Sequence, residues 1–251
     1  HILIMPYMEL NTIHDQLDLT PNTGLGWGNA TNATALHQVM IDTYRCPSTT
    51  MPKFTGTSNG KQHMGSSYTG ILGATDALWP TGYTGQQDNS ASCGGCCCGG
   101  HKVRNGSLVP NNTDDLVVAL DGTSKTICIG EQSGRVLIGT NKQYWSSTSR
   151  HGILIGTNRS NQNWNGYNNT RTFGLTAVRY NINEEGPFTD NCGQHGVCNN
   201  GATNVPLNSM HPGGTHAMNL DGSVIFLSEN LELDTLGKLC IKDDGQAISG
   251  L

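Results

Sequence analysis

The sequence has little charge, few aromatic side chains and no long hydrophobic run. Charged residues make up 13% of the 251 residues and aromatic residues 6%, and the formal net charge is −5. The 14 lysines and arginines are scattered, so no basic patch predicts binding to nucleic acid. No apolar run approaches the roughly 18 residues that span a bilayer, so we expect no membrane span in this chain.

Glycine, in contrast, is abundant at 33 residues, and asparagine and threonine are frequent. This composition favours turns, strands and long ordered loops over helix bundles. A chain of this length can bury a substantial core. We therefore predict one α+β domain over residues 1–251, in which a short helical region within 1–41 packs on an antiparallel β-sheet. The β-rich part, residues 42–251, carries long loops at 74–113 and 184–204.

Apolar spacing and turn residues place the individual elements. Leu10, Ile13 and Leu17 have the i, i+3, i+7 spacing of a helix. We predict helices over 1–19 and 33–41, a loop over 51–64, a short helix or strand ending at Cys240, and strands over 43–46, 67–72, 116–120, 126–130, 136–139, 153–156 and 177–182.

A turn followed by a β-hairpin is predicted near the C-terminus. A proline and two glycines at 212–214 supply the turn, because proline fixes φ and glycine permits positive φ. Strands over 216–220 and 223–228 are then joined by a two-residue type I′ turn at Asp221-Gly222.

This register decides which hairpin residues lie opposite each other. Met218 would face Ile225, and His216 would face Leu227. Apolar side chains would then lie on both faces of the hairpin, so we expect other parts of the protein to cover each face.

Nine cysteines are many for a cytosolic protein of this size and indicate an oxidising, extracellular compartment. We expect Cys192 to pair with Cys198, and one thiol must stay free or pair between chains. A metal site built from the 93–98 tract, His101 and the segment around His195 is the alternative, although zinc usually takes two separated ligand pairs. The disulfide candidates are Cys46, Cys93, Cys96, Cys97, Cys98, Cys128, Cys192, Cys198 and Cys240.

Asn-x-Ser/Thr sequons also point outside the cytosol. Such a sequon is the acceptor for N-linked glycans when it lies on the surface of a secreted protein. Surface glycosylation is therefore a hypothesis for six residues, namely Asn29, Asn32, Asn105, Asn111, Asn158 and Asn168.

Five segments resemble a known family in the same order along the chain. His211, nine further residues and then Asp221-Gly222 resemble the signature of the prepilin-type processing-associated H-x9-DG family, domain of unknown function 1559. The other four segments are MPYME at 5–9, YRCPS at 44–48, DGTSKTI at 121–127 and VRYNIN at 178–183. Members of this family resemble type IV pilins and the pseudopilins of type II secretion.

The resemblance implies a pilin-like head and a structural function. Family members begin with a basic leader and a long apolar helix, which we expect to have been removed or left out of this sequence. We predict a self-associating subunit of an extracellular filament or cell-surface assembly, with disulfides, covalent glycans, no catalytic residue, no metal ligand and no required cofactor. Calcium in a loop is conceivable by resemblance, and Asp114-Asp115, Glu184-Glu185 and Asp243-Asp244 are the acidic pairs.

Two other functions stay open at this stage. A monomeric glycan-binding module would use Trp79, Tyr83, Trp164 and Tyr167 as stacking platforms. A hydrolase would use the histidines, but the strand places His216 and Asp221 roughly 15 Å apart, so we expect His211 to fix the 212–214 turn instead. Ser58 fits the pattern G-x-S-x-G but lacks the strand and helix of a nucleophile elbow, so we interpret it as a turn residue.

Overall fold

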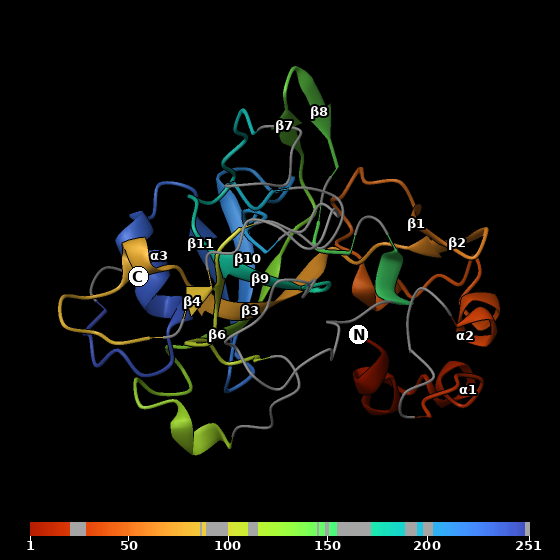
Figure 1. Ribbon diagram of the computed structural model, residues 1–251, viewed down its shortest axis with the longest axis horizontal. Coiled ribbons are helices and arrows are strands. Elements are labelled where there is room, and N and C mark those ends of the chain that lie inside the picture. Colours follow the sequence, from red (N-terminus) through yellow and green to blue (C-terminus); the bar gives the residue numbers. More distant parts are fainter. Residues whose placement is uncertain are drawn as a thin grey trace.

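A five-stranded mixed sheet lies at the centre of the computed structural model (Figure 1). Its strand order is β11-β10-β6-β3-β9, and all neighbours are antiparallel except β3 and β9. The strands are β3 (Tyr68–Ala74), β6 (Ile127–Glu131), β9 (Leu175–Val178), β10 (Gly214–Asn219) and β11 (Val224–Ser228). The structure describes residues 1–20, 29–85, 87–88, 100–109, 115–144, 146–148, 151–154, 172–188, 195–197 and 203–248.

Helix α3 (Leu233–Cys240) packs on the sheet and completes its main core. Its buried side chains recur every three or four residues, so one stripe of the helix faces Ile71 of β3 and Ile127 of β6. Leu236 and Leu239 are fully buried in this core. The predicted α+β class is confirmed, and the element predicted to end at Cys240 as either a short helix or a strand is a helix.

The β10–β11 hairpin forms, but its register differs from the prediction by one residue. Met218 lies opposite Val224, and His216 lies opposite Phe226. The loop has three residues instead of two, because the amide of Asn219 donates to the carbonyl of Ser223 and Gly222 takes a φ of 86°.

The corrected register separates the two faces of the hairpin. Thr215, Ala217 and Leu227 face the core and are buried, whereas Val224 and Phe226 are exposed on the opposite face. The expectation that both faces are covered is therefore wrong as far as the described residues go, since Val224 and Phe226 are left exposed.

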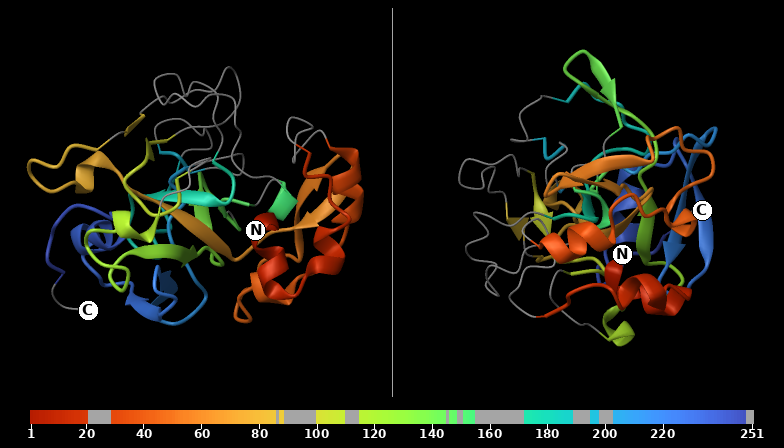
Figure 2. Two further views of the ribbon diagram at one scale, coloured as in Figure 1. Left: turned by 90° about the horizontal axis from the view of Figure 1, so that it is seen from below. Right: turned by 90° about the vertical axis from the view of Figure 1, so that its right-hand side faces the viewer.

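An N-terminal unit packs beside the sheet (red and orange in Figure 2). Strands β1 (Phe54–Ser58) and β2 (Lys61–Met64) are joined by a two-residue turn, because Asn59 and Gly60 both have positive φ. The loop predicted over 51–64 is therefore largely a hairpin. Met5, Leu36 and Met64 are buried in its separate core. The unit consists of η1 (Ile2–Met8), α1 (Asn11–His14), α2 (Ala30–Ala35), η2 (Asp42–Tyr44), β1 (Phe54–Ser58) and β2 (Lys61–Met64).

Short elements fill the rest of the described chain. Strands are predicted over 116–120 and 153–156, but Leu116–Val118 and Gly152–Leu154 form 3-10 turns, and residues 155 and 156 lie outside the described residues. Residues 43–46 begin in η2 rather than in a strand. Leu116 and Val117 are apolar yet exposed, so their pattern does not mark a core strand. These elements are η3 (Asp76–Leu78), β4 (Gln87–Asp88), β5 (Lys102–Val103), η4 (Leu116–Val118), β7 (Val136–Ile138), β8 (Asn141–Gln143) and η5 (Gly152–Leu154).

The helices of the described residues are all short. None of them combines the length and the hydropathy that crossing a membrane requires.

Leu239→Ala should test the packing of α3 on the sheet. Removing a fully buried leucine side chain leaves a cavity, so we expect the free energy of unfolding to fall by about 2–5 kcal/mol in urea denaturation. The matched control Leu116→Ala removes an exposed side chain and should change it by less than about 0.5 kcal/mol. Equal effects of the two substitutions would contradict this assignment of the core.

Candidate functional site

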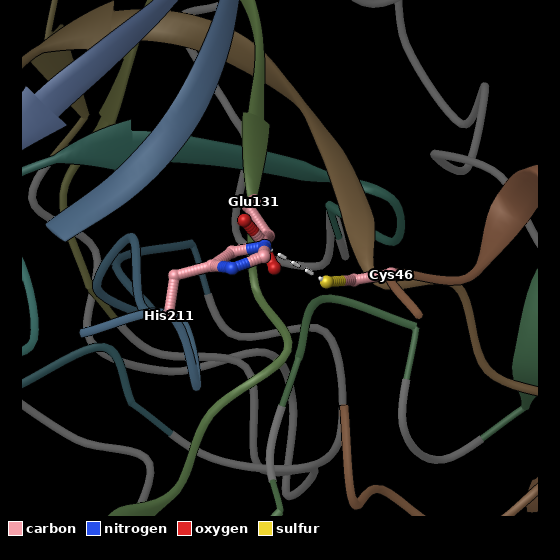
Figure 3. Close-up of side chains that lie close together, drawn as sticks. All are labelled: Cys46, Glu131 and His211. Carbon is pink, nitrogen blue, oxygen red and sulfur yellow. Dashed lines mark hydrogen bonds between the residues drawn. The ribbon is translucent and has the colours of Figure 1, made fainter. Parts of the chain in front are cut away.

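Three side chains from distant parts of the sequence meet between the N-terminal unit and the sheet (Figure 3). Cys46 follows η2, Glu131 is the last residue of β6, and His211 precedes β10. One ligand atom from each of the three lies within 4.8 Å of the other two. The site is therefore assembled by the tertiary fold and not by any local motif.

The Glu131 carboxylate is the buried centre of this site. The side chain is 1% exposed, and its Oε1 accepts hydrogen bonds from the hydroxyls of Ser133 (2.5 Å) and Ser209 (2.9 Å). Its Oε2 accepts from the backbone amide of His216 at 3.4 Å. These bonds attach the end of β6 to the segment before β10 and to β10 itself.

The His211 ring points from the sheet toward the N-terminal unit. Its Nε2 lies 3.3 Å from Cys46 Sγ, and its Nδ1 lies 3.4 Å from Ser48 Oγ. The ring also makes an edge-to-face contact with His216, with centroids 4.8 Å apart. If Nδ1 carries the proton and donates it to Ser48, the Nε2 lone pair faces Cys46.

The Cys46 thiol is buried at the junction. Burial raises its pKa above the ordinary value, and the neighbouring Glu131 carboxylate raises it further. The thiol form is therefore favoured at neutral pH. A nucleophilic cysteine needs a lowered pKa, so this environment opposes covalent catalysis even though a histidine is adjacent.

The donor set favours a metal over a reaction at the thiol. Sulfur, imidazole nitrogen and carboxylate oxygen are the three ligand types that zinc takes from proteins. Within the described residues this is the one group of three or more such side chains close enough to share an ion. The sequence predicted no metal ligand here, because no spacing along the chain links the three residues.

Comparison with known proteins places the chain in a family. A family model described as a protein of unknown function (DUF1559) matches residues 1–234. The chain belongs to the DUF1559 family. No curated protein and no solved structure matches it significantly. The resemblance inferred from the motifs is thereby confirmed for this family.

The two ends of the H-x9-DG motif, His211 and Asp221-Gly222, lie before and after strand β10. His211 lies in the three-residue site, whereas Asp221 and Gly222 form the turn into β11. Asp221 Oδ1 accepts hydrogen bonds from the amide and hydroxyl of Ser223, which lowers the pKa of the Asp221 carboxyl. The amide of Asp221 donates to the carbonyl of Thr123 in the DGTS turn.

The prediction that His211 fixes the Pro-Gly-Gly turn is corrected by these contacts. Its ring nitrogens lie against Cys46 and Ser48 and its backbone amide donates to Ser209 Oγ, while only the edge-to-face contact with His216 spans the turn. The pairing with Cys46 joins residues that are 165 positions apart, which sequence reasoning alone missed. Cys46 lies in the YRCPS segment and His211 begins the H-x9-DG motif. Both segments carry the family resemblance, and this was the one feature of the sequence that could have linked the two residues.

Three of the disulfide candidates are corrected as well. Cys46, Cys128 and Cys240 are buried free thiols in the structure. The Cys128 thiol donates to the carbonyl of Met218 at 3.4 Å, and Cys240, the last residue of α3, packs in the main core. The other candidates lie outside the described residues, namely Cys93, Cys96, Cys97, Cys98, Cys192 and Cys198.

Three of the glycosylation candidates are buried, which argues against their modification. Asn29 caps α2 and its Nδ2 donates to Asp18, while Asn32 Nδ2 donates to the carbonyl of Asp18. Asn105 Nδ2 donates to the carbonyl of Ala74. The nitrogen that would carry a glycan is therefore used inside the fold. Asn111, Asn158 and Asn168 lie outside the described residues.

Of the remaining candidates, Tyr83 and the Asp243-Asp244 pair line one open, polar pocket. Ser58 ends β1 before a β-turn, so it is not on a nucleophile elbow. The rings of Trp79 and Tyr83 meet edge to face at 76° and pack against the core rather than forming a flat platform. Asp243 accepts a hydrogen bond from Tyr83, so part of the expected calcium pair serves a local contact. Trp164 and Tyr167 lie outside the described residues.

Thiol labelling should distinguish the buried cysteines from disulfides. Burial raises the pKa of Cys128 to about 11 and that of Cys240 to about 12. Both thiols should therefore stay unlabelled by iodoacetamide at pH 8 in the folded chain and react fully in denaturant, as read by peptide mass spectrometry. Recovery of either residue in a disulfide would contradict the structure.

The raised pKa values of Cys128 and Cys240 predict that the free energy of unfolding falls in alkaline solution. In the unfolded chain the two thiols lose their protons above about pH 9, whereas in the folded chain they keep them to higher pH. Their contribution to stability is thus complete below pH 9 and is lost as the pH rises toward 11–12. The free energy of unfolding should fall over this range, and Cys240→Ala should reduce the slope.

Peptide mapping of the natively expressed chain should find Asn29, Asn32 and Asn105 unmodified. Enzymatic deglycosylation in heavy-oxygen water marks each occupied asparagine by its mass, so occupancy is read site by site. A glycan at any of these three buried residues would contradict the packing described here.

Proposed function

We propose that this chain is a structural subunit of an extracellular filament or cell-surface assembly, and that it associates with copies of itself through the exposed face of the β10–β11 hairpin. The observation that carries the proposal is the apolar character of edge strand β11. Val224 is 64% exposed and Phe226 is 50% exposed. Both side chains lie on the face of the hairpin that points away from the core.

The edge itself favours association with another chain. β11 is the last strand of the sheet, so one side of its backbone has no partner strand among the described residues. Monomeric proteins usually protect such an edge with a charge, a proline or a bulge, and Val224–Ser228 contains none of these. A copy of the chain docked here would cover the unpaired edge and both apolar side chains.

A repeating contact needs a second, different surface. The 3-10 turn η4 offers one, because Leu116, Val117 and Leu120 are all more than 60% exposed. Packing of β11 from one copy against η4 of the next would be a heterologous contact, which propagates into a filament unless it closes into a ring. A stable contact of this kind should bury more than about 1,000 Å².

Membership of the DUF1559 family and the motif resemblance to pilin-like proteins support the same proposal. The extracellular location and the glycans at the undescribed sequons stay predictions. Glycan binding and hydrolysis also stay predictions, and neither has a specific observation in its favour among the described residues.

Substitution of the exposed apolar residues should weaken self-association. Val224→Asp, Phe226→Asp and Val117→Asp each place a charge in the proposed contact, so we expect the dissociation constant to rise at least about tenfold by sedimentation velocity. The matched control Asn141→Asp adds the same charge on exposed strand β8 and should leave association unchanged.

Electron microscopy of the same samples gives the corresponding morphology. The wild-type chain should form regular oligomers or fibres, and the three variants should give separate particles. A wild-type chain that stays monomeric at every concentration, or variants that assemble as the wild type does, would contradict the proposal.

A further inference from the structure

We propose that Cys46, Glu131 and His211 bind one divalent cation of the zinc class. This site is independent of the proposed self-association, because it lies between the N-terminal unit and the sheet and not on the exposed face of β11.

The spacing of the ligand atoms suits tetrahedral coordination. Bonds of about 2.0–2.3 Å to nitrogen, oxygen and sulfur at tetrahedral angles separate the ligand atoms by roughly 3.3–3.6 Å. The Cys46 Sγ to His211 Nε2 distance is 3.3 Å, and all three ligand atoms lie within 4.8 Å of one another. A small side-chain movement would close the remaining distances around an ion.

The charge of Glu131 calls for a cation. A carboxylate that is 1% exposed is costly to bury as an ion unless a positive charge neutralises it. Among the described residues its ion-pair partner is His216, which is half-exposed and 4.0 Å away. No lysine or arginine of the described chain forms a salt bridge with it. A bound dication would supply the missing charge.

Neighbouring hydroxyls already orient the ligands. Ser133 and Ser209 both donate to Glu131 Oε1, so the more weakly bonded Oε2 keeps acceptor capacity. Ser48 lies at His211 Nδ1, which leaves Nε2 directed at Cys46. Histidine ligands of metals commonly have such a partner on the other ring nitrogen.

The chemistry also selects the class of ion. Binding forms a metal–sulfur bond and releases the Cys46 thiol proton to the buffer, so the dication, the thiolate and the carboxylate sum to zero charge. A thiolate ligand favours zinc, cobalt and related ions over calcium and magnesium, which prefer oxygen ligands alone. Three protein ligands leave a fourth position for water.

Cobalt is the probe for the experiment, because a cobalt–thiolate bond has its own charge-transfer absorption. The chain is reduced, freed of metal with a chelator and titrated with cobalt and then zinc. We expect the band to saturate at one equivalent and zinc to displace the cobalt. Cys46→Ser should abolish the band, and Glu131→Gln and His211→Asn should each weaken binding at least about a hundredfold.

Two controls separate this site from the other cysteines. Cys128→Ser removes a buried thiol elsewhere in the sheet and should leave the titration unchanged. A variant with serine at positions 93, 96, 97 and 98 should also retain the band. Retention of the band in Cys46→Ser together with its loss in the four-serine variant would overturn the proposal.

Ser48→Ala keeps the experiment decisive if a ligand variant fails to fold. Ser48 is exposed and does not supply a metal ligand, so the variant should fold. We expect its affinity for cobalt to fall about tenfold, because the His211 ring loses the partner that orients it. A wild-type chain that binds no cobalt, or a Ser48→Ala variant with unchanged affinity, would overturn the proposal.

Discussion

The buried carboxylate of Glu131 is the constraint on which the rest of the structure depends. Glu131 is the last residue of β6, the central strand of the sheet, and its carboxylate accepts hydrogen bonds from the hydroxyls of Ser133 and Ser209. The carboxylate also lies beside Cys46 of the N-terminal unit. A carboxyl group at this depth is costly to bury unless hydrogen-bond donors surround it. The segments that meet there are consequently held in one relative arrangement, and the sheet and N-terminal unit share a polar junction between their separate apolar cores.

This junction gives a physical reason for the family signature. The residues between His211 and Asp221 contain strand β10, so one end of the strand reaches the polar junction and the other makes the turn into β11. That turn in turn contacts the DGTS loop through Thr123. The motif thus describes the length of one strand with a fixed group at each end, and the edge strand β11 that follows is placed as a result.

Local signals were sufficient for much of the fold. The apolar period and the turn residues predicted β3, β6 and the C-terminal hairpin, because each depends on its own local pattern. The element ending at Cys240 was predicted as either a helix or a strand, and it is helix α3. The hairpin register could not be read from Asp221-Gly222 alone, since two- and three-residue loops share this dipeptide. Leu116, Val117 and Leu120 are apolar but exposed, so the apolar run at 116–120 did not indicate a buried strand. Cys46, Glu131 and His211 share no local pattern, and only the three-dimensional fold brings them together.

X-ray absorption at the zinc edge, on the chain loaded with one equivalent of zinc, tests most directly whether this junction is a metal site. The arrangement of Cys46, Glu131 and His211 predicts one sulfur at about 2.3 Å and two or three nitrogen or oxygen atoms at about 2.0–2.2 Å. A shell without sulfur, or a shell of four sulfurs, would contradict it, because neither can be built from these three side chains.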